Sequence, residues 1–179
     1  TDIRDGLARE LLRLDGMRDA HQNLMLSKLG NMEGTIKDCS DFLGNYQKSS
    51  VKGQLGENYL QKVLTEMYPS GEILNTTGTP HSCDFRLDRK NGSDIILFET
   101  KEYGSNVSLA EVDKFKRDID TQKQHGIFLS QKSGITTKHN FQFDFKGAKI
   151  LVYVHNVGYN PDLIQIAVNL IDAISPKLK

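Results

Sequence analysis

The amino-acid sequence predicts a mixed α/β domain preceded by a long helical arm. Three observations support this fold class. Residues 2–48 contain no proline and carry apolar residues at helical spacing. The stretch 72–101 contains three short strand-like runs separated by turn residues, and helical and strand patterns alternate after it. The predicted order after the arm is helix, three strands, helix, two strands and helix, which is typical of a mixed sheet built on a hairpin and a crossover.

The predicted arm covers residues 1–50 and contains a heptad pattern. Along one run the apolar positions alternate in steps of four and three: Met25, Leu29, Met32, Ile36, Cys39, Leu43 and Tyr46. Glycines within the arm, among them Gly6, Gly16, Gly30 and Gly34, would weaken an isolated helix, so we expect it to need a partner surface. Two interpretations remain open. The arm forms a homodimer as a coiled coil or helical hairpin, or it packs against the domain of its own chain.

The second predicted domain covers residues 51–179. Its helices are expected at 51–67, 109–124 and 161–174. Its strands are expected at 72–76, 82–87, 95–101, 127–130 and 149–155. The Asn91-Gly92 pair is a turn signal that joins the second and third strands as a hairpin. The polar stretch 134–145 is predicted to be a loop, and its length indicates a functional segment.

Composition limits the classes of function. The 23 basic residues balance the 23 acidic residues, which argues against a generally basic nucleic-acid binder but leaves room for a nuclease with local charges. Two cysteines exclude a disulfide scaffold and a four-cysteine zinc module. No apolar run approaches the ~18 residues of a membrane span, and no signal peptide is visible, so we expect a cytoplasmic or nuclear protein with no membrane partner. The chain begins at Thr1 and not at Met, which leaves a preceding targeting segment open.

The chemistry is expected at the hairpin. Glu99 and Lys101 share one face of their strand because side chains alternate, and they follow four apolar residues that must be largely buried. A buried charge is costly unless it is paired or bound to a metal. Folding about Asn91-Gly92 brings Asp84 opposite Glu99. Two carboxylates suit Mg²⁺, and a lysine beside the metal can orient or deprotonate a water molecule and hold a phosphate.

These residues resemble a known active-site signature. Asp84, followed after a hairpin by Glu99-Thr100-Lys101, is similar to the signature of the PD-(D/E)XK nuclease superfamily. The segment Lys52-Gly53-Gln54-Leu55-Gly56-Glu57 resembles the glycine–glutamate motif of the first core helix in many members. Among these are Holliday-junction resolvases and RmuC-type recombination proteins, and the helical arm is loosely similar to the RmuC type. The resemblance covers about residues 51–154, although Cys83 replaces the proline of the motif.

The resemblance implies a restriction-endonuclease-like αβββαβ core and a metal-dependent nuclease. Glu57, Asp84 and Glu99 would hold Mg²⁺, with Mn²⁺ as a substitute, and Lys101 would position the attacking water. The expected reaction is hydrolysis of phosphodiester bonds in DNA, during repair, recombination or processing. We expect an endonuclease rather than an exonuclease. RNA as the substrate would involve the same residues and stays open. The alternative is a catalytically inactive nuclease-fold module for DNA binding or for protein assembly through the arm.

Four further residues are predicted to contact nucleic acid: Lys52, Ser130, Lys132 and Lys138. Ser130 and Lys132 end a strand that is expected to lie beside the catalytic strand. Lys138 belongs to the long predicted loop, and Lys52 opens the glycine–glutamate motif. The lysines would give a locally positive rim around the acidic pocket, on a chain of zero net charge.

The same chemistry has structural interpretations. Glu99 and Lys101 form a plain ion pair if their strand face is exposed, but the apolar run before them argues against this. Glu57 could be a solvated helix residue whose neighbouring glycines serve helix packing. For Cys83 and Lys114 we favour the structural interpretation, as a small core residue and as part of a solvated helix face.

Overall fold

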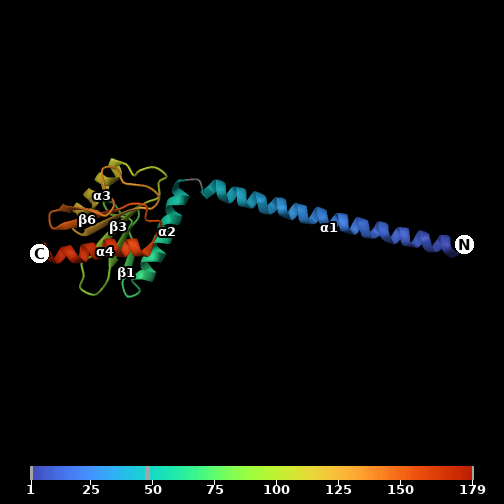
Figure 1. The fold of residues 1–179 in the computed structure, drawn as a ribbon, viewed down its shortest axis with the longest axis horizontal. Helices are drawn as coiled ribbons and strands as arrows, with labels where there is room; N and C mark the ends of the chain where they lie inside the picture. The colour runs from blue at the N-terminus through green and yellow to red at the C-terminus, as the bar shows by residue number, and fades with distance from the viewer. Residues whose placement is uncertain (1, 47–48, 179) are drawn as a thin grey trace. The chain divides into compact units, whose positions relative to one another are not determined.

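The computed structural model describes residues 2–46 and 49–178. The chain divides into two compact units, Thr1–Ser49 and Ser50–Lys179. This division falls next to the boundary expected between residues 50 and 51. The first unit contains helix α1 (Asp2–Tyr46), and the second is a mixed α/β domain (Figure 1). The predicted fold class, a mixed α/β domain with a long N-terminal helix, is therefore confirmed.

Helix α1 is continuous over 45 residues. The heptad side chains Met25, Leu29, Met32 and Ile36 are each more than half exposed, and Cys39 is exposed too. The side chains of Leu43 and Tyr46, which continue the heptad pattern, lie outside the side chains that the structure describes. Despite the length of α1, no helix among the described residues has both the extent and the hydropathy needed to cross a bilayer.

The second unit contains a six-stranded mixed sheet with the order β1-β2-β3-β4-β6-β5. Its strands are β1 (Glu72–Asn75), β2 (Phe85–Asp88), β3 (Ile96–Lys101), β4 (His125–Ser130), β5 (Gln142–Lys146) and β6 (Lys149–Val154). The β1–β2, β2–β3 and β5–β6 pairs are antiparallel, whereas β3–β4 and β4–β6 are parallel. The parallel strands β3, β4 and β6 therefore end at the same edge of the sheet.

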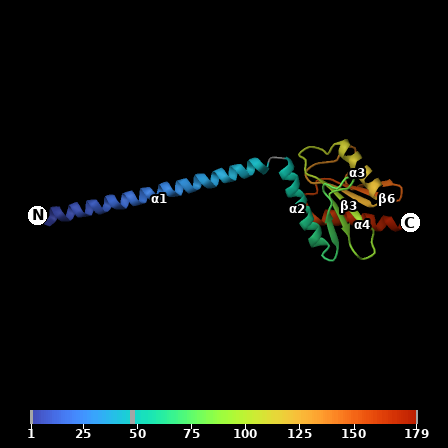
Figure 2. The same ribbon diagram turned by 180° about the vertical axis from the view of Figure 1, so that it is seen from behind.

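Helices cover both faces of this sheet (Figures 1 and 2). Helices α2 (Ser49–Met67) and α4 (Pro161–Ile174) lie on one face, and α3 (Leu109–Gln122) lies on the other, with a short 3-10 helix at Ser175–Lys177. The α2/α4 side buries the larger core, which includes Leu60, Phe85, Phe98 and Ile164. The α3 side buries a smaller core around Val112, Phe115, Ile119, Leu97 and Cys83. Glu99 belongs to the α3 side because it alternates with Phe98.

Strand β5 corrects the prediction of a loop over 134–145. It pairs with β6 through the two-residue turn Gly147-Ala148, in which Gly147 has a φ of 58°. Glycine adopts this left-handed conformation at little cost, so the tight hairpin can close here. The alternation of Phe143 and Phe145 with polar residues is itself a strand pattern, but it is short, it lies at an edge of the sheet, and its turn lacks the Asn-Gly signal that marks the other hairpin.

The connection between β2 and β3 is longer than a tight Asn-Gly hairpin. It spans residues 89–95, with Lys90 and Gly92 at positive φ and the Asn91 side chain accepting a hydrogen bond from Ser93 N–H. The antiparallel register nevertheless pairs Phe85 with Phe98. The two strands therefore meet as the turn signal predicted, although the turn itself is more open.

Candidate active site

Asp84, Glu99 and Lys101 meet at the adjoining ends of β2 and β3. The Asp84 N–H donates to the Phe98 carbonyl oxygen at 2.9 Å, which extends the antiparallel pairing one residue beyond β2. The Thr100 N–H donates to Asp84 Oδ2 at 2.8 Å and fixes that carboxylate. Lys101 Nζ lies 2.9 Å from Glu99 Oε1. The structure thus brings together the three residues that the hairpin argument placed in one site.

Helix α3 adds a row of charged side chains along the same strand. Lys101 Nζ is 3.7 Å from Glu111 Oε2, and Lys114 Nζ is 3.2 Å from Glu99 Oε1 and 3.4 Å from Asp118 Oδ2. Glu111, Lys114 and Asp118 are three and four residues apart, so they share one face of the helix. The sequence favours a solvated face for Lys114. The structure corrects this, because Lys114 is half-buried against two carboxylates.

Glu99 is the centre of this group. It is only 1% exposed, and its Oε1 atom receives both lysines. Its Oε2 atom is also buried and has no hydrogen-bond partner among the described residues. A buried carboxylate oxygen without a partner is costly unless an ion or a water molecule binds it. One oxygen of Glu99 is therefore available to a ligand.

The surroundings raise the pKa values of both Asp84 and Lys101. Burial and the charge of Glu99 raise the pKa of the Asp84 carboxyl to about 7, against the lowering effects of Lys101 and the Thr100 N–H. For Lys101, burial alone would lower the pKa, but the charges of Glu99 and Asp84 outweigh it and raise the pKa. Lys101 therefore stays an ammonium group. This favours orientation and phosphate binding over the deprotonation of water that the sequence had left open.

Glu57 lies on α2 at the margin of the group. Thr77 Oγ1 donates to Glu57 Oε2 at 3.0 Å, and the charge of Glu57 contributes to the raised pKa of Asp84. Glu57 is thus close enough to act on Asp84 electrostatically, while its hydrogen bond with Thr77 joins it to the loop after β1. We assign it an outer position in the site.

The glycine before Glu57 allows a close contact. A Cβ atom at Gly56 would lie 2.5 Å from the Tyr159 hydroxyl oxygen. That hydroxyl donates to Glu102 Oε2 at 2.8 Å, and Lys132 Nζ lies 2.5 Å from Glu102 Oε1. The glycine–glutamate segment of α2 therefore packs against a polar cluster at the carboxyl ends of the parallel strands. At Gly53, in contrast, an added Cβ atom would have no neighbour within 4 Å.

Gln131 connects the end of β3 with the segment before α4 through hydrogen bonds. It is not among the residues that the sequence singles out. It is buried, donates from Nε2 to Thr100 Oγ1 at 2.8 Å and accepts from the Tyr159 N–H through Oε1 at 2.8 Å. A polar residue between Ser130 and Lys132, directly after an apolar strand, is the only signal for it. Its role depends on Tyr159, which is distant in sequence.

Two of the predicted nucleic-acid contacts lie near this edge. Lys132 is exposed and pairs with Glu102, as described above. Burial would raise the pKa of Glu102, but the hydrogen bonds from Lys132 and Tyr159 and the charge of Lys132 lower it, and the charge of Lys52 adds to this lowering. Both lysines are therefore beside the residue that follows Lys101.

The other two predicted contacts have structural partners. Ser130 is fully buried, and its hydroxyl is hydrogen-bonded to Ser133 Oγ at 3.1 Å. Lys138 is largely buried in an ion pair with Asp144, with its Nζ 4.6 Å from the centre of the Tyr153 ring. Burial keeps both side chains away from a ligand at the surface. We therefore leave Ser130 and Lys138 out of the candidate site.

The donor set at Asp84 and Glu99 fits Mg²⁺. This ion prefers oxygen ligands and usually takes one or two carboxylates, with the remaining positions filled by water and phosphate. A cation bound here would give the unpartnered Oε2 of Glu99 a partner and would offset the burial and the Glu99 charge that raise the pKa of Asp84.

A serine–histidine–aspartate group elsewhere does not form a hydrolytic triad. Ser175 Oγ lies 3.3 Å from His125 Nε2, and Asp94 lies beside both. The His125 Nδ1 atom accepts the Ile150 N–H at 3.0 Å, so the ring proton is on Nε2. An imidazole protonated on the atom facing the serine cannot accept the serine proton. This group instead fastens the end of α4 to the sheet.

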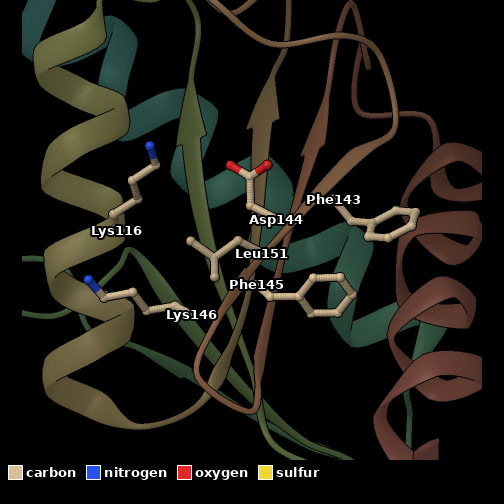
Figure 3. Close-up of a pocket in the computed structure, with 6 residues that line it drawn as sticks. All are labelled: Lys116, Phe143, Asp144, Phe145, Lys146 and Leu151. Carbon is tan, nitrogen blue, oxygen red and sulfur yellow. The ribbon is translucent and has the colours of Figure 1, made fainter. Parts of the chain in front are cut away.

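A hollow of ≈ 550 Å³ lies beside β5, and strands β4 and β6 separate β5 from β3 and the acidic site (Figure 3). Its lining residues are Lys116, Phe143, Asp144, Phe145, Lys146 and Leu151. Asp144 and Lys146 point to the side of the strand where Lys116 of α3 lies, while both phenylalanine rings turn to the other side. Its one carboxylate is paired with Lys138, so the hollow offers no reactive group.

Comparison with known proteins identifies no relative. A scan against protein-family models, a search of curated proteins and a search of solved structures each gave no match to this chain. The function must therefore be inferred from the geometry and chemistry of the site.

Proposed function

We propose that this chain is a Mg²⁺-dependent nuclease of the PD-(D/E)XK type that hydrolyses phosphodiester bonds in DNA as an endonuclease. One observation carries the proposal. Asp84, Glu99 and Lys101 converge where two paired strands end, in surroundings that hold the pKa of Asp84 near 7 and leave one Glu99 oxygen without a partner among the described residues. The element order α2-β1-β2-β3-α3-β4 supports the proposed restriction-endonuclease-like αβββαβ core.

In this proposal, Asp84 and Glu99 hold the Mg²⁺, and Glu57 supports them from its outer position. When bound, the ion supplies positive charge at the scissile phosphate and lowers the pKa of a bound water molecule. The Thr100 N–H keeps Asp84 oriented, and Lys114 holds Glu99 from the helix side. Lys101 remains an ammonium group that orients the attacking water and contacts a phosphate oxygen.

The surrounding surface supports a phosphate substrate. Lys132 and Lys52 both lie beside Glu102, one residue after Lys101. Lysine side chains at such a rim bind the phosphates of a nucleic-acid backbone without reading its sequence. They give a local positive charge to a chain whose net charge is zero. We further propose that the exposed heptad face of α1 pairs two copies of the chain.

The direct test is a cleavage assay on circular single-stranded DNA, supercoiled plasmid, a four-way junction and RNA, with Mg²⁺, Mn²⁺ or EDTA. We expect metal-dependent cutting of at least one DNA, including closed circles because the enzyme is proposed to be an endonuclease. Lys101→Ala and Asp84→Asn should each reduce the rate by about 10²-fold or more.

Lys62→Ala is the matched control, because Lys62 is an exposed lysine on α2 that pairs only weakly with Glu66 at 3.9 Å. It should leave cleavage unchanged. Absence of cutting on every substrate, with DNA binding retained, would contradict the catalytic proposal and favour the inactive DNA-binding or assembly module. Preferential cutting of RNA would overturn the choice of DNA.

A further inference from the structure

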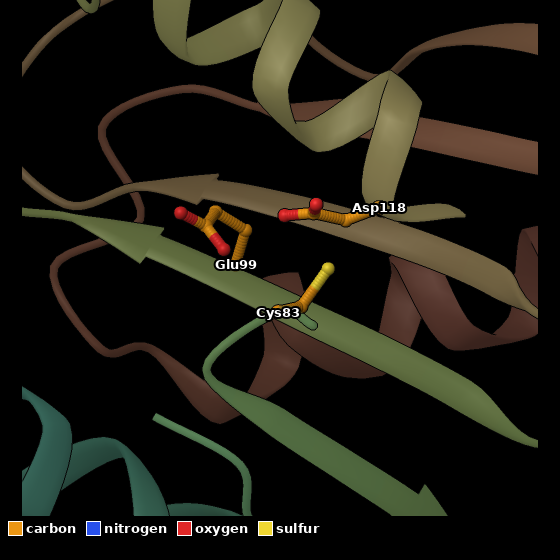
Figure 4. A group of neighbouring side chains, drawn as sticks. All are labelled: Cys83, Glu99 and Asp118. Carbon is orange, nitrogen blue, oxygen red and sulfur yellow. The ribbon is translucent and has the colours of Figure 1, made fainter. Parts of the chain in front are cut away.

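Three potential metal ligands, one of them Glu99, face one another between β3 and α3 (Figure 4). They are the thiol of Cys83, just before β2, and the carboxylates of Glu99 and Asp118. One ligand atom from each lies within 4.8 Å of the others, and all three residues are buried. Among the described residues, these three donors lie close enough together to share one ion. It differs from the Asp84–Glu99 pair because it includes sulfur.

The space between these donors has an excess of negative charge. The carboxylates of Glu99, Asp118 and Asp84 act on it with negative charge, whereas the Lys114 ammonium acts on it with positive charge. Burial and then the charges of Glu99, Asp118 and Asp84 raise the pKa of the Cys83 thiol. Surroundings that oppose an additional negative charge are the same ones that attract a cation.

Two polar atoms in this space lack hydrogen-bond partners. Glu99 Oε2 and Asp118 Oδ2 are both buried and accept no hydrogen bond from the described residues. Lys114 Nζ is 3.4 Å from Asp118 Oδ2, which is an ion-pair contact, and 3.2 Å from Glu99 Oε1. Lys114 thus bridges the two carboxylates with a single positive charge but leaves the carboxylate oxygens incompletely satisfied.

We propose that Cys83, Glu99 and Asp118 form a second cation site, selective for a thiophilic divalent ion such as Zn²⁺, which Lys114 fills in the metal-free protein. Sulfur disfavours Mg²⁺ and favours Zn²⁺ or a similar transition metal, and two carboxylates with one thiolate leave a fourth tetrahedral position for water. On binding, the Cys83 S–H bond breaks, its proton passes to solvent, and the thiolate sulfur donates its electron pair to the metal.

The geometry permits this exchange with small movements. Ligand atoms around a tetrahedral Zn²⁺ are about 3.5 Å apart. The three donors, which lie within 4.8 Å of one another, therefore need to approach by at most about 1.3 Å. The Lys114 side chain is 44% exposed and can swing into solvent as the ion enters. The ion and the Lys114 ammonium therefore exclude each other. The inference does not rest on the proposed nuclease activity, although the two sites share Glu99.

Co²⁺ is the probe for this site, because a cobalt–thiolate bond produces a charge-transfer absorption that oxygen ligands do not. The experiment uses the full chain with Cys39→Ser, which removes the exposed second cysteine on α1. We expect the absorption to appear on titration with Co²⁺ and to disappear on addition of Zn²⁺. Cys83→Ser and Asp118→Asn should remove or strongly reduce it, while Asp84→Asn should retain it. Lys114→Met should lower the Kd for Co²⁺ by about tenfold or more, because it removes the competing charge.

Absence of cobalt–thiolate absorption in folded Cys39→Ser protein would overturn the proposal, and so would its persistence in Cys83→Ser. If Cys83→Ser does not fold, X-ray absorption of Zn²⁺-loaded Cys39→Ser protein decides: a sulfur neighbour at about 2.3 Å supports the site and an all-oxygen shell refutes it. The nuclease is judged separately by DNA cleavage with Mg²⁺. Cobalt–thiolate absorption without cleavage would leave this site standing and reject the proposed function.

Discussion

Burial and the charge of the neighbouring Glu99 carboxylate both raise the pKa of the Asp84 carboxyl group. Both disfavour the ionised form, and the lysine and backbone N–H that favour it compensate only in part, so the carboxyl pKa is about 7. The metal-free protein thus stores electrostatic repulsion in the pair Asp84–Glu99. A divalent cation between the carboxylates would release it, which links the stability of the protein to metal binding.

This predicts that the contribution of Asp84 to the stability of the metal-free protein falls as the pH rises from about 4 to about 7. In that interval, folded Asp84 keeps a proton that the unfolded chain, with an ordinary aspartate pKa of 3.8, has already released. Because the folded state binds more protons, the free energy of unfolding falls with increasing pH. Asp84→Asn should abolish this contribution and stabilise the protein above pH 7 by at most about 4 kcal/mol.

The measurement is urea unfolding in EDTA at several pH values between 4 and 8. Asp113→Asn, an exposed aspartate on α3, is the control and should keep the pH slope of the original protein. An Asp84→Asn variant with the same slope as the original protein would mean that Asp84 titrates normally.

At the scale of elements, the site depends on how α2 and α3 meet the sheet. Helix α3 lays Glu111, Lys114 and Asp118 along β3, so three of the charged groups near Glu99 come from a helix that follows it in sequence. Helix α2 lies on the opposite face of the sheet. Its Gly56 lies close to Tyr159, just before α4, and to Glu102, just after β3. The two helices thus hold the edge of the sheet from both sides.

Two glycines in α2 should respond in opposite ways to the same substitution. Gly53→Ala adds a methyl group in open space within a helix, and should stabilise the protein by roughly 0.5–1 kcal/mol. Gly56→Ala places the methyl group against the Tyr159 hydroxyl and Glu102, and should make the protein about 1–3 kcal/mol less stable than Gly53→Ala. Thermal unfolding of the pair measures the difference. Equal stabilities would mean that Tyr159 and Glu102 move aside freely.

At the scale of the whole molecule, α1 and the α/β domain are separate compact units. The heptad side chains of α1 that the structure describes are exposed, and a coiled coil of two chains would bury them against each other. The homodimer stays a prediction. Dimerisation would place two proposed nuclease domains on one assembly.

Ile36→Asp should therefore weaken the dimer without unfolding the α/β domain. It removes an apolar side chain from the seam of each helix, each worth about 1.5–3 kcal/mol when buried, so the Kd for dimerisation should rise at least about tenfold. Lys37→Asp, the neighbouring position outside the seam, is the control and should have a much smaller effect. Sedimentation at several concentrations reports the Kd, and a wild-type chain that stays monomeric at all of them would refute the proposed dimer.

The sequence predicted much of the site because its residues are close in the chain. Glu99 and Lys101 are two residues apart on one strand, and a turn signal sufficed to place Asp84 opposite them. The prediction depended on strand alternation and antiparallel pairing, which are local properties. They held even though the Asn91-Gly92 turn proved to be part of a longer connection.

The contribution of α3 does not follow from the sequence alone. Glu111, Lys114 and Asp118 recur at helical spacing, next to the buried positions Val112 and Phe115. That spacing is equally typical of a solvated helix face. Only the direction in which α3 crosses β3 decides that Lys114 meets Glu99, and no local pattern sets that crossing.

By itself, the sequence determined the fold class, the long N-terminal helix and the convergence of Asp84, Glu99 and Lys101, since each follows from periodicity or short-range pairing. The tertiary structure decided the sixth strand, the burial of Ser130 and Lys138, the Gln131–Tyr159 contact and the Cys83–Glu99–Asp118 cluster. These features join segments that are far apart in the chain. Their contacts depend on how helices and strands pack in three dimensions, which residue spacing along one segment does not specify.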